Sequence, residues 1–163
     1  GGVLINAGAG SCGASVYLSI TPGAIFSNTP SATFELAEDN HGFGGAGLFA
    51  NAGTLRKTSG TGTSALGFPC NNSGTIEVQT GTLSLSGGGS GSGTLQVLNG
   101  ATLDFSGGTY TLQAGSLVTG AGTVRCSHPY ATVNVNGSWN LTGAHSFAPG
   151  PLALCGGAQR HQC

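Results

Sequence analysis

Charged side chains are scarce in this sequence. Its 163 residues include four Lys or Arg and five Asp or Glu, and the formal net charge is −1. So few cations cannot neutralise a run of phosphates, which excludes a nucleic-acid-binding surface. They are also too few for electrostatic attachment to a membrane, and no apolar run approaches the roughly 18 residues of a membrane-spanning helix. We therefore expect neither a nucleic-acid partner nor membrane insertion.

Proline is also infrequent, with 6 residues, whereas glycine reaches 32. The glycines follow no Gly-X-Y period, which excludes a collagen triple helix. Apolar residues make up 38% of the chain, which argues against a disordered segment. A length of 163 residues suits one folded domain or one segment of a longer repetitive protein.

The cysteine count is odd, so at least one thiol is free or pairs between chains. Three Asn-X-Ser/Thr triplets begin at Asn71, Asn136 and Asn140. Together with the low charge, these triplets favour an oxidising, extracellular setting. We expect a secreted or cell-surface protein, and five residues are candidates for cross-links: Cys12, Cys70, Cys126, Cys155 and Cys163.

A short sequence motif that begins with Gly-Thr, called the Gly-Thr phrase below, recurs along the chain. Within each phrase apolar and variable residues alternate, and this period of two is typical of a β-strand with one buried face. The leading glycine can form a tight corner, and the β-branched threonine suits the first position of a strand. The phrases are Gly53-Thr-Leu-Arg-Lys, Gly74-Thr-Ile-Glu-Val, Gly81-Thr-Leu-Ser-Leu, Gly93-Thr-Leu-Gln-Val, Gly108-Thr-Tyr-Thr-Leu and Gly122-Thr-Val-Arg-Cys.

The spacing of the phrases predicts the fold. Gly74 and Gly81 are 7 residues apart, and Gly93 begins the next group 19 residues after Gly74. Three short strands and their corners would fill that longer interval, so we predict an all-β fold, a three-sided parallel β-solenoid (parallel β-helix) of about seven coils. Right-handed coiling is expected from the usual handedness of parallel connections. The solenoid would occupy residues 1–147, with an irregular loop near 38–47 and an irregular C-terminal tail at 148–163.

The register of the coils can be inferred from the charges. Arg56 and Glu77 occupy equivalent outward places in phrases 21 residues apart, and so do Asp104 and Arg125. Stacked coils would make each pair vertical neighbours of opposite charge.

The segment from Asn51 to Val124 resembles the repeats of large bacterial exoproteins and autotransporter passenger domains. The resemblance rests on Asn51-Ala-Gly-Thr-Leu-Arg-Lys, Asn72-Ser-Gly-Thr-Ile-Glu-Val and Gly120-Ala-Gly-Thr-Val. It implies a right-handed parallel β-helix at or outside the cell surface, acting as an adhesin, a spacer or a biofilm component.

Few residues have the types and spacings that catalysis requires. The one acidic cluster consists of Glu35, Glu38 and Asp39 with His41, which we interpret as a solvated loop. Zinc ligands could come from two groups, but their spacings match no standard zinc motif: Cys126 with His128, and Cys155 with His161 and Cys163. We expect no catalytic residues, no metal site, no cofactor and no enzymatic activity.

We therefore predict a structural or adhesive role, as a surface fibre, a matrix component or an adhesin stalk that self-associates end to end. One alternative is a β-helix that binds or cleaves an extracellular glycan through stacking aromatic side chains. The candidate glycan contacts are Tyr17, Tyr110, Tyr130 and Trp139. A second alternative is ice binding through outward threonines, and among the predicted outward strand positions only Thr109 and Thr111 form a Thr-x-Thr pair.

Overall fold

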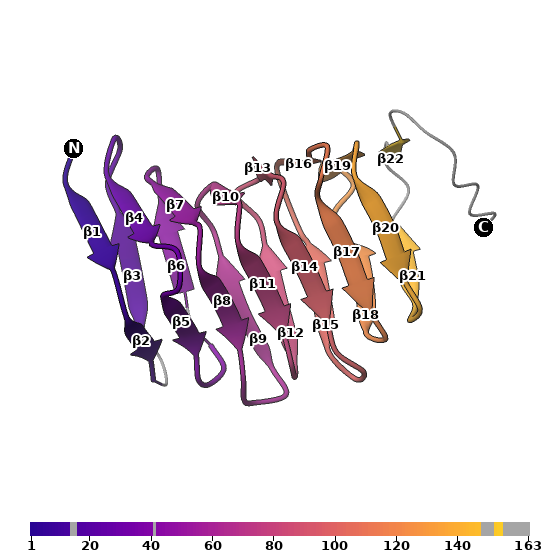
Figure 1. The fold of residues 1–163 in the computed structure, drawn as a ribbon, viewed down its shortest axis with the longest axis horizontal. Coiled ribbons are helices and arrows are strands. Elements are labelled where there is room, and N and C mark those ends of the chain that lie inside the picture. Colours follow the sequence, from indigo (N-terminus) through magenta and orange to yellow (C-terminus); the bar gives the residue numbers. More distant parts are fainter. Residues whose placement is uncertain (14–15, 41, 148–151, 155–163) are drawn as a thin grey trace.

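The chain forms a three-sided parallel β-solenoid of about seven turns (Figure 1). The computed structural model describes residues 1–13, 16–40 and 42–147, together with the backbone of 152–154. All regular elements in these ranges are strands, so no helix that could cross a membrane occurs among them. The predicted fold class and number of coils are confirmed.

Three parallel sheets form the sides, and each coil contributes one short strand to every sheet. Sheet A contains β1 (Val3–Asn6), β4 (Ile25–Asn28), β7 (Leu48–Asn51), β10 (Cys70–Asn72), β13 (Gly89–Gly91), β16 (Thr109–Leu112), β19 (Thr132–Val135) and β22 (Leu152–Leu154). Sheet B contains β2 (Ala9–Cys12), β5 (Thr33–Leu36), β8 (Thr54–Lys57), β11 (Thr75–Val78), β14 (Thr94–Val97), β17 (Leu117–Gly120) and β20 (Ser138–Leu141). Sheet C contains β3 (Tyr17–Ile20), β6 (Gly42–Gly45), β9 (Thr63–Leu66), β12 (Thr82–Leu85), β15 (Thr102–Phe105), β18 (Thr123–Cys126) and β21 (His145–Phe147).

The charge-based register is correct. Arg56 pairs in register with Glu77 between β8 and β11, and Asp104 pairs with Arg125 between β15 and β18. The second pair is also an ion pair, with 2.9 Å between Arg125 Nη2 and Asp104 Oδ2. Arg56 instead approaches Glu35 in the preceding coil, with Nε 3.4 Å from Oε1.

Two expected irregular segments contain strands. The segment 38–47, predicted to be a loop, includes β6, which pairs with β3 and β9 because Phe43 continues the inward column of sheet C. The segment 148–163, predicted to be an irregular tail, includes β22, which pairs with β19. The remaining residues of that segment lie outside the described ranges.

Inward side chains build a columnar core, and the corners bring successive coils very close together. Leu55, Ile76 and Leu95 stack over one another in sheet B and are fully buried. At the corner that precedes these strands, a Cβ atom on Gly74 would clash with the carbonyl oxygen of Gly53. Only a residue without a side chain fits there, which explains why this corner ends with glycine.

Four asparagines also face inward, at the last position of strands in sheet A. We call Asn6, Asn28, Asn51 and Asn72 the asparagine ladder. Asn28 Nδ2 donates to Asn51 Oδ1 at 2.7 Å, and Asn51 Nδ2 donates to Asn72 Oδ1 at 2.7 Å. Because the buried amides satisfy one another, polar side chains are tolerated inside the solenoid.

Replacing Asn51 with leucine tests this account. The change removes the donor to Asn72 Oδ1 and an acceptor for Asn28 Nδ2, and we expect a loss of about 1–3 kcal/mol for each group left unsatisfied. Urea denaturation would measure the free energy of unfolding. The control is Asn71→Ala on the outer face of β10, which should cost less than about 1 kcal/mol, and equal losses in the two variants would contradict the ladder's role.

Candidate functional site

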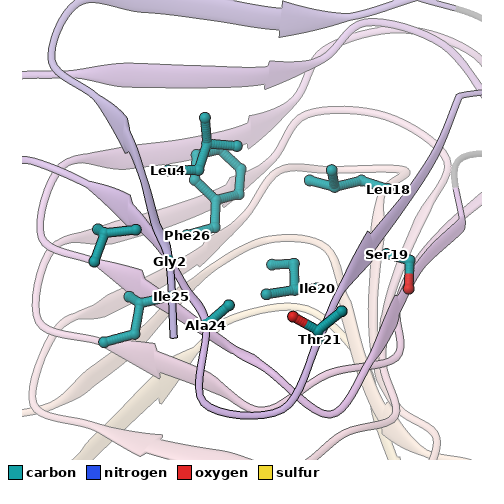
Figure 2. A pocket seen from close by; sticks show the side chains of 10 residues that line it. Gly2, Leu4, Leu18, Ser19, Ile20, Thr21, Ala24, Ile25 and Phe26 are labelled. Carbon is teal, nitrogen blue, oxygen red and sulfur yellow. The ribbon is translucent and has the colours of Figure 1, made fainter.

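The N-terminal end of the solenoid is open. Leu4 occupies an inward position, in register with the buried Phe26, yet it is 54% exposed because no coil lies above it. Figure 2 shows Leu4, Leu18, Ile20 and Phe26 around the resulting hollow, whose volume is about 300 Å³. The strands of this first coil (β1, β2 and β3) also leave one edge without a strand partner. The N-terminal end therefore carries an apolar hollow lined by described residues.

The surface around this end is apolar as well. Val3 and Ile5 point outward from β1 and are more than half exposed. Val3 is in register with Ile25, and Ile25 is in register with Leu48, so an apolar column extends from the open end along the outer face of sheet A. Ile25 and Leu48 are only partly exposed, so the strongly exposed part of this face is Val3 and Ile5 in the first coil. Exposed apolar patches are typical of contact surfaces.

The acidic cluster does not converge on a common point. Glu35 lies on β5 beside Arg56, whereas Asp39 lies at the next corner and forms an ion pair with the fully buried Lys57, at 2.7 Å between Oδ1 and Nζ. Asp39 therefore has a structural partner, which the solvated-loop interpretation did not foresee. Glu38 contributes backbone contacts, and His41 lies outside the described residues.

The polar atoms of the Lys57–Asp39 pair are hydrogen-bonded within the protein. Lys57 Nζ also lies 2.9 Å from the carbonyl oxygen of Ser59 and 3.5 Å from that of Glu38, so each of its three hydrogens has an acceptor. Asp39 Oδ2 accepts a hydrogen bond from the Gly62 backbone N–H at 2.7 Å. These bonds, that of Lys57 first, lower the pKa of Asp39 below its ordinary value of 3.8.

The candidate glycan contacts are scattered. The structure contradicts the assignment of Tyr110, which is 1% exposed and packs against Phe105 in the core, because outward Thr109 and Thr111 leave it facing inward. Trp139 occupies an inward position of β20 and packs against the core. Tyr17 and Tyr130 are exposed, but they belong to the first and sixth coils and share no platform.

The described cysteines are free thiols with no disulfide between them: Cys12, Cys70 and Cys126. Burial raises the pKa of Cys70 to about 12, and Cys126 is a core residue whose Sγ contacts the carbonyl oxygen of Ala131 at 3.5 Å. Cys12 is partly exposed at the open end. Cys155 and Cys163 lie outside the described ranges, so their candidacy for cross-links stays a prediction.

Within the described part of the chain, no three His, Cys, Asp or Glu side chains gather in an arrangement that could hold a metal ion. Of the two groups considered as zinc ligands, Cys126 faces the core, and His128 Nδ1 accepts a hydrogen bond from the Tyr130 backbone N–H at 3.3 Å. The other group, with His161, lies beyond the described residues. Lys57 was not among the residues singled out from the sequence, although the alternation in Thr54–Lys57 does place it on the inward face.

The Lys57–Asp39 pair should make stability depend on pH. Because the folded-state pKa of Asp39 is lowered, the pair stabilises the fold above pH 3.8, and this contribution is lost as the pH falls through the folded-state pKa. Asp39→Asn should therefore lower the free energy of unfolding at pH 7, with the difference from wild type shrinking below pH 3.8. Adding Lys57→Met should recover stability, because the unpaired ammonium is then gone. Urea denaturation across a pH series measures both effects, and an Asp39→Asn variant as stable as wild type at pH 7 would contradict them.

Comparison of the chain with protein-family models, with curated proteins and with solved structures gives no match. The assignment as a three-sided parallel β-solenoid therefore rests on the strands, their register and their stacking.

Proposed function

We propose that this chain is a structural segment of an extracellular fibre, matrix or adhesin stalk, which stacks end to end through its open N-terminal coil. The observation that carries the proposal is the uncovered core at that end, where Leu4 is more than half exposed beside the hollow. Burying such apolar surface favours association with another coil. The chain is proposed to act without enzymatic chemistry and without a cofactor.

Three further features support this proposal. The resemblance of the Gly-Thr phrases to repeats of bacterial exoproteins and autotransporter passenger domains favours a secreted or cell-surface location. The ion pairs of Asp39 with Lys57 and of Asp104 with Arg125 each join two coils. Stacked coils also resist bending because each strand is hydrogen-bonded to its neighbours in the sheet, which suits a spacer.

Leu4→Asp tests the stacking function. A carboxylate at the centre of the end would have to be buried without a partner, so we expect association to weaken at least about tenfold. Sedimentation velocity would measure association of the non-reduced protein, and electron microscopy would show whether rods longer than one solenoid form.

The matched control is Asn71→Asp, which adds the same charge on the outer face of β10 and keeps the acceptor oxygen that faces Ser90. This control should associate like the wild type. Wild-type particles of single-solenoid length at every concentration, or unchanged association of the Leu4→Asp variant, would contradict the stacking function.

Ice binding is the second candidate, because the described outward positions of sheet A carry no charged side chain. They are Val3, Ile5, Ile25, Ser27, Leu48, Ala50, Asn71, Ser90, Thr109, Thr111, Thr132 and Asn134. If this face binds ice, the purified protein should show thermal hysteresis that Thr111→Lys reduces. Absence of hysteresis in the wild type would eliminate this candidate.

A further inference from the structure

The asparagine ladder has a direction. Asn6 Nδ2 donates to Asn28 Oδ1 at 2.8 Å, and the same donation passes from Asn28 to Asn51 and from Asn51 to Asn72. Every amide nitrogen in these bonds thus faces the following coil. Every amide oxygen that accepts them faces the preceding coil.

A second set of hydrogen bonds prevents the amides from turning over. Asn6 Nδ2 also donates to the carbonyl oxygen of Thr33 at 2.9 Å, and Asn51 Nδ2 donates to that of Thr75 at 2.9 Å. A reversed amide would place its oxygen against these carbonyl oxygens, which offer no hydrogen. The direction of the ladder is therefore set by the backbone of sheet B.

The consequence is visible at the open end. Because Asn6 Nδ2 bonds toward the second coil, its Oδ1 faces away from that coil, and no donor to it occurs among the described residues. It is a hydrogen-bond acceptor on the apolar end that Leu4 and Ile5 expose. A partner that covers this end must supply a donor here, or an acceptor is buried without one.

We propose that the N-terminal end binds one further β-coil, stacked in parallel, that carries an asparagine directly over Asn6. The inference rests on the proposed stacking function and names its partner. An asparagine at that place would donate to Asn6 Oδ1, as Asn6 does to Asn28, and to the carbonyl oxygen of Ala9, which is in register with Thr33. Such a coil matches this end in two ways: its amide donates in the direction of the ladder, and its docking buries the exposed apolar surface of the first coil.

A second copy of this chain fits the same end less well. Stacked head to tail with β22 on β1, it would place Leu154 over Asn6, since Leu154 is in register with Val135 at this position of sheet A. Leucine has no side-chain N–H. Stacked head to head, two copies would present the same acceptor to each other. In neither arrangement do the described residues of a copy offer Asn6 Oδ1 the donor that an asparagine-bearing coil provides.

The experiment adds such a coil to the full chain. Residues 69–87, a copy of the coil that contains Asn72, replace Gly1 and Gly2 directly before Val3. In the native chain, residue 88 lies in register with residue 69 of the preceding coil. Val3 takes the place of residue 88 at this junction, so the copied Asn72 lies over Asn6. The matched variant carries Asn72→Leu in the copied coil only.

We expect a Tm about 2–4 °C higher for the variant whose added coil carries asparagine than for the one whose added coil carries leucine. When Asn6→Leu is added to both variants, the one whose added coil carries leucine should instead have the higher Tm, because leucine then packs against leucine. Hydrogen exchange measured by mass spectrometry should show protection of the β1 amides wherever the added coil has docked. No protection in any of these variants, or no preference for asparagine over leucine, would overturn the inference.

The outcomes separate this inference from the stacking function. If Leu4→Asp abolishes association of the wild-type chain while the added coils show no asparagine preference, end-to-end stacking stands and the partner assignment falls. If the wild-type chain never associates but the asparagine-bearing coil docks with the expected preference, the partner assignment stands without self-association.

Discussion

Parallel stacking of coils places each residue directly over its counterpart in the next coil, at the strand spacing of about 4.8 Å. This spacing requires like residues to follow one another along the axis. Leu55, Ile76 and Leu95 form an apolar column, and the glycines at the corner before them permit backbone approaches that no Cβ would allow. Charges on neighbouring coils must alternate in sign or be absent, as Asp104 and Arg125 illustrate.

Polar groups enter the interior only where the stacking itself satisfies them. Asn28 and Asn51 exchange hydrogen bonds with their own counterparts, so their repetition removes the usual penalty for burying an amide. Lys57 has no such counterpart between Leu36 and Val78, and it is satisfied instead by Asp39 and backbone oxygens at the corner. In both cases the partner lies in an adjacent coil or corner.

The same requirement explains why the end of the solenoid is the most distinctive surface. Interior coils have neighbours on both sides, whereas the first coil lacks one and exposes Leu4 and the oxygen of Asn6. The outer faces carry isolated ion pairs and exposed aromatic residues without a shared platform. The uncovered first coil is therefore the feature on which the proposed role in assembly rests.

The sequence by itself determined the architecture. Period-two alternation and the recurring Gly-Thr phrase predicted the strands of the later coils and the register of Asp104 with Arg125, because these features depend on local spacing. Only the tertiary structure showed that Lys57 meets Asp39 and that segment 38–47 contains β6. Both depend on the path of the backbone through the corners, which decides which residues of neighbouring coils come together. The direction of the asparagine ladder was also decided by the tertiary structure. It is set by backbone carbonyl groups of the following coil, and no sequence pattern shows that these groups lie beside the amides.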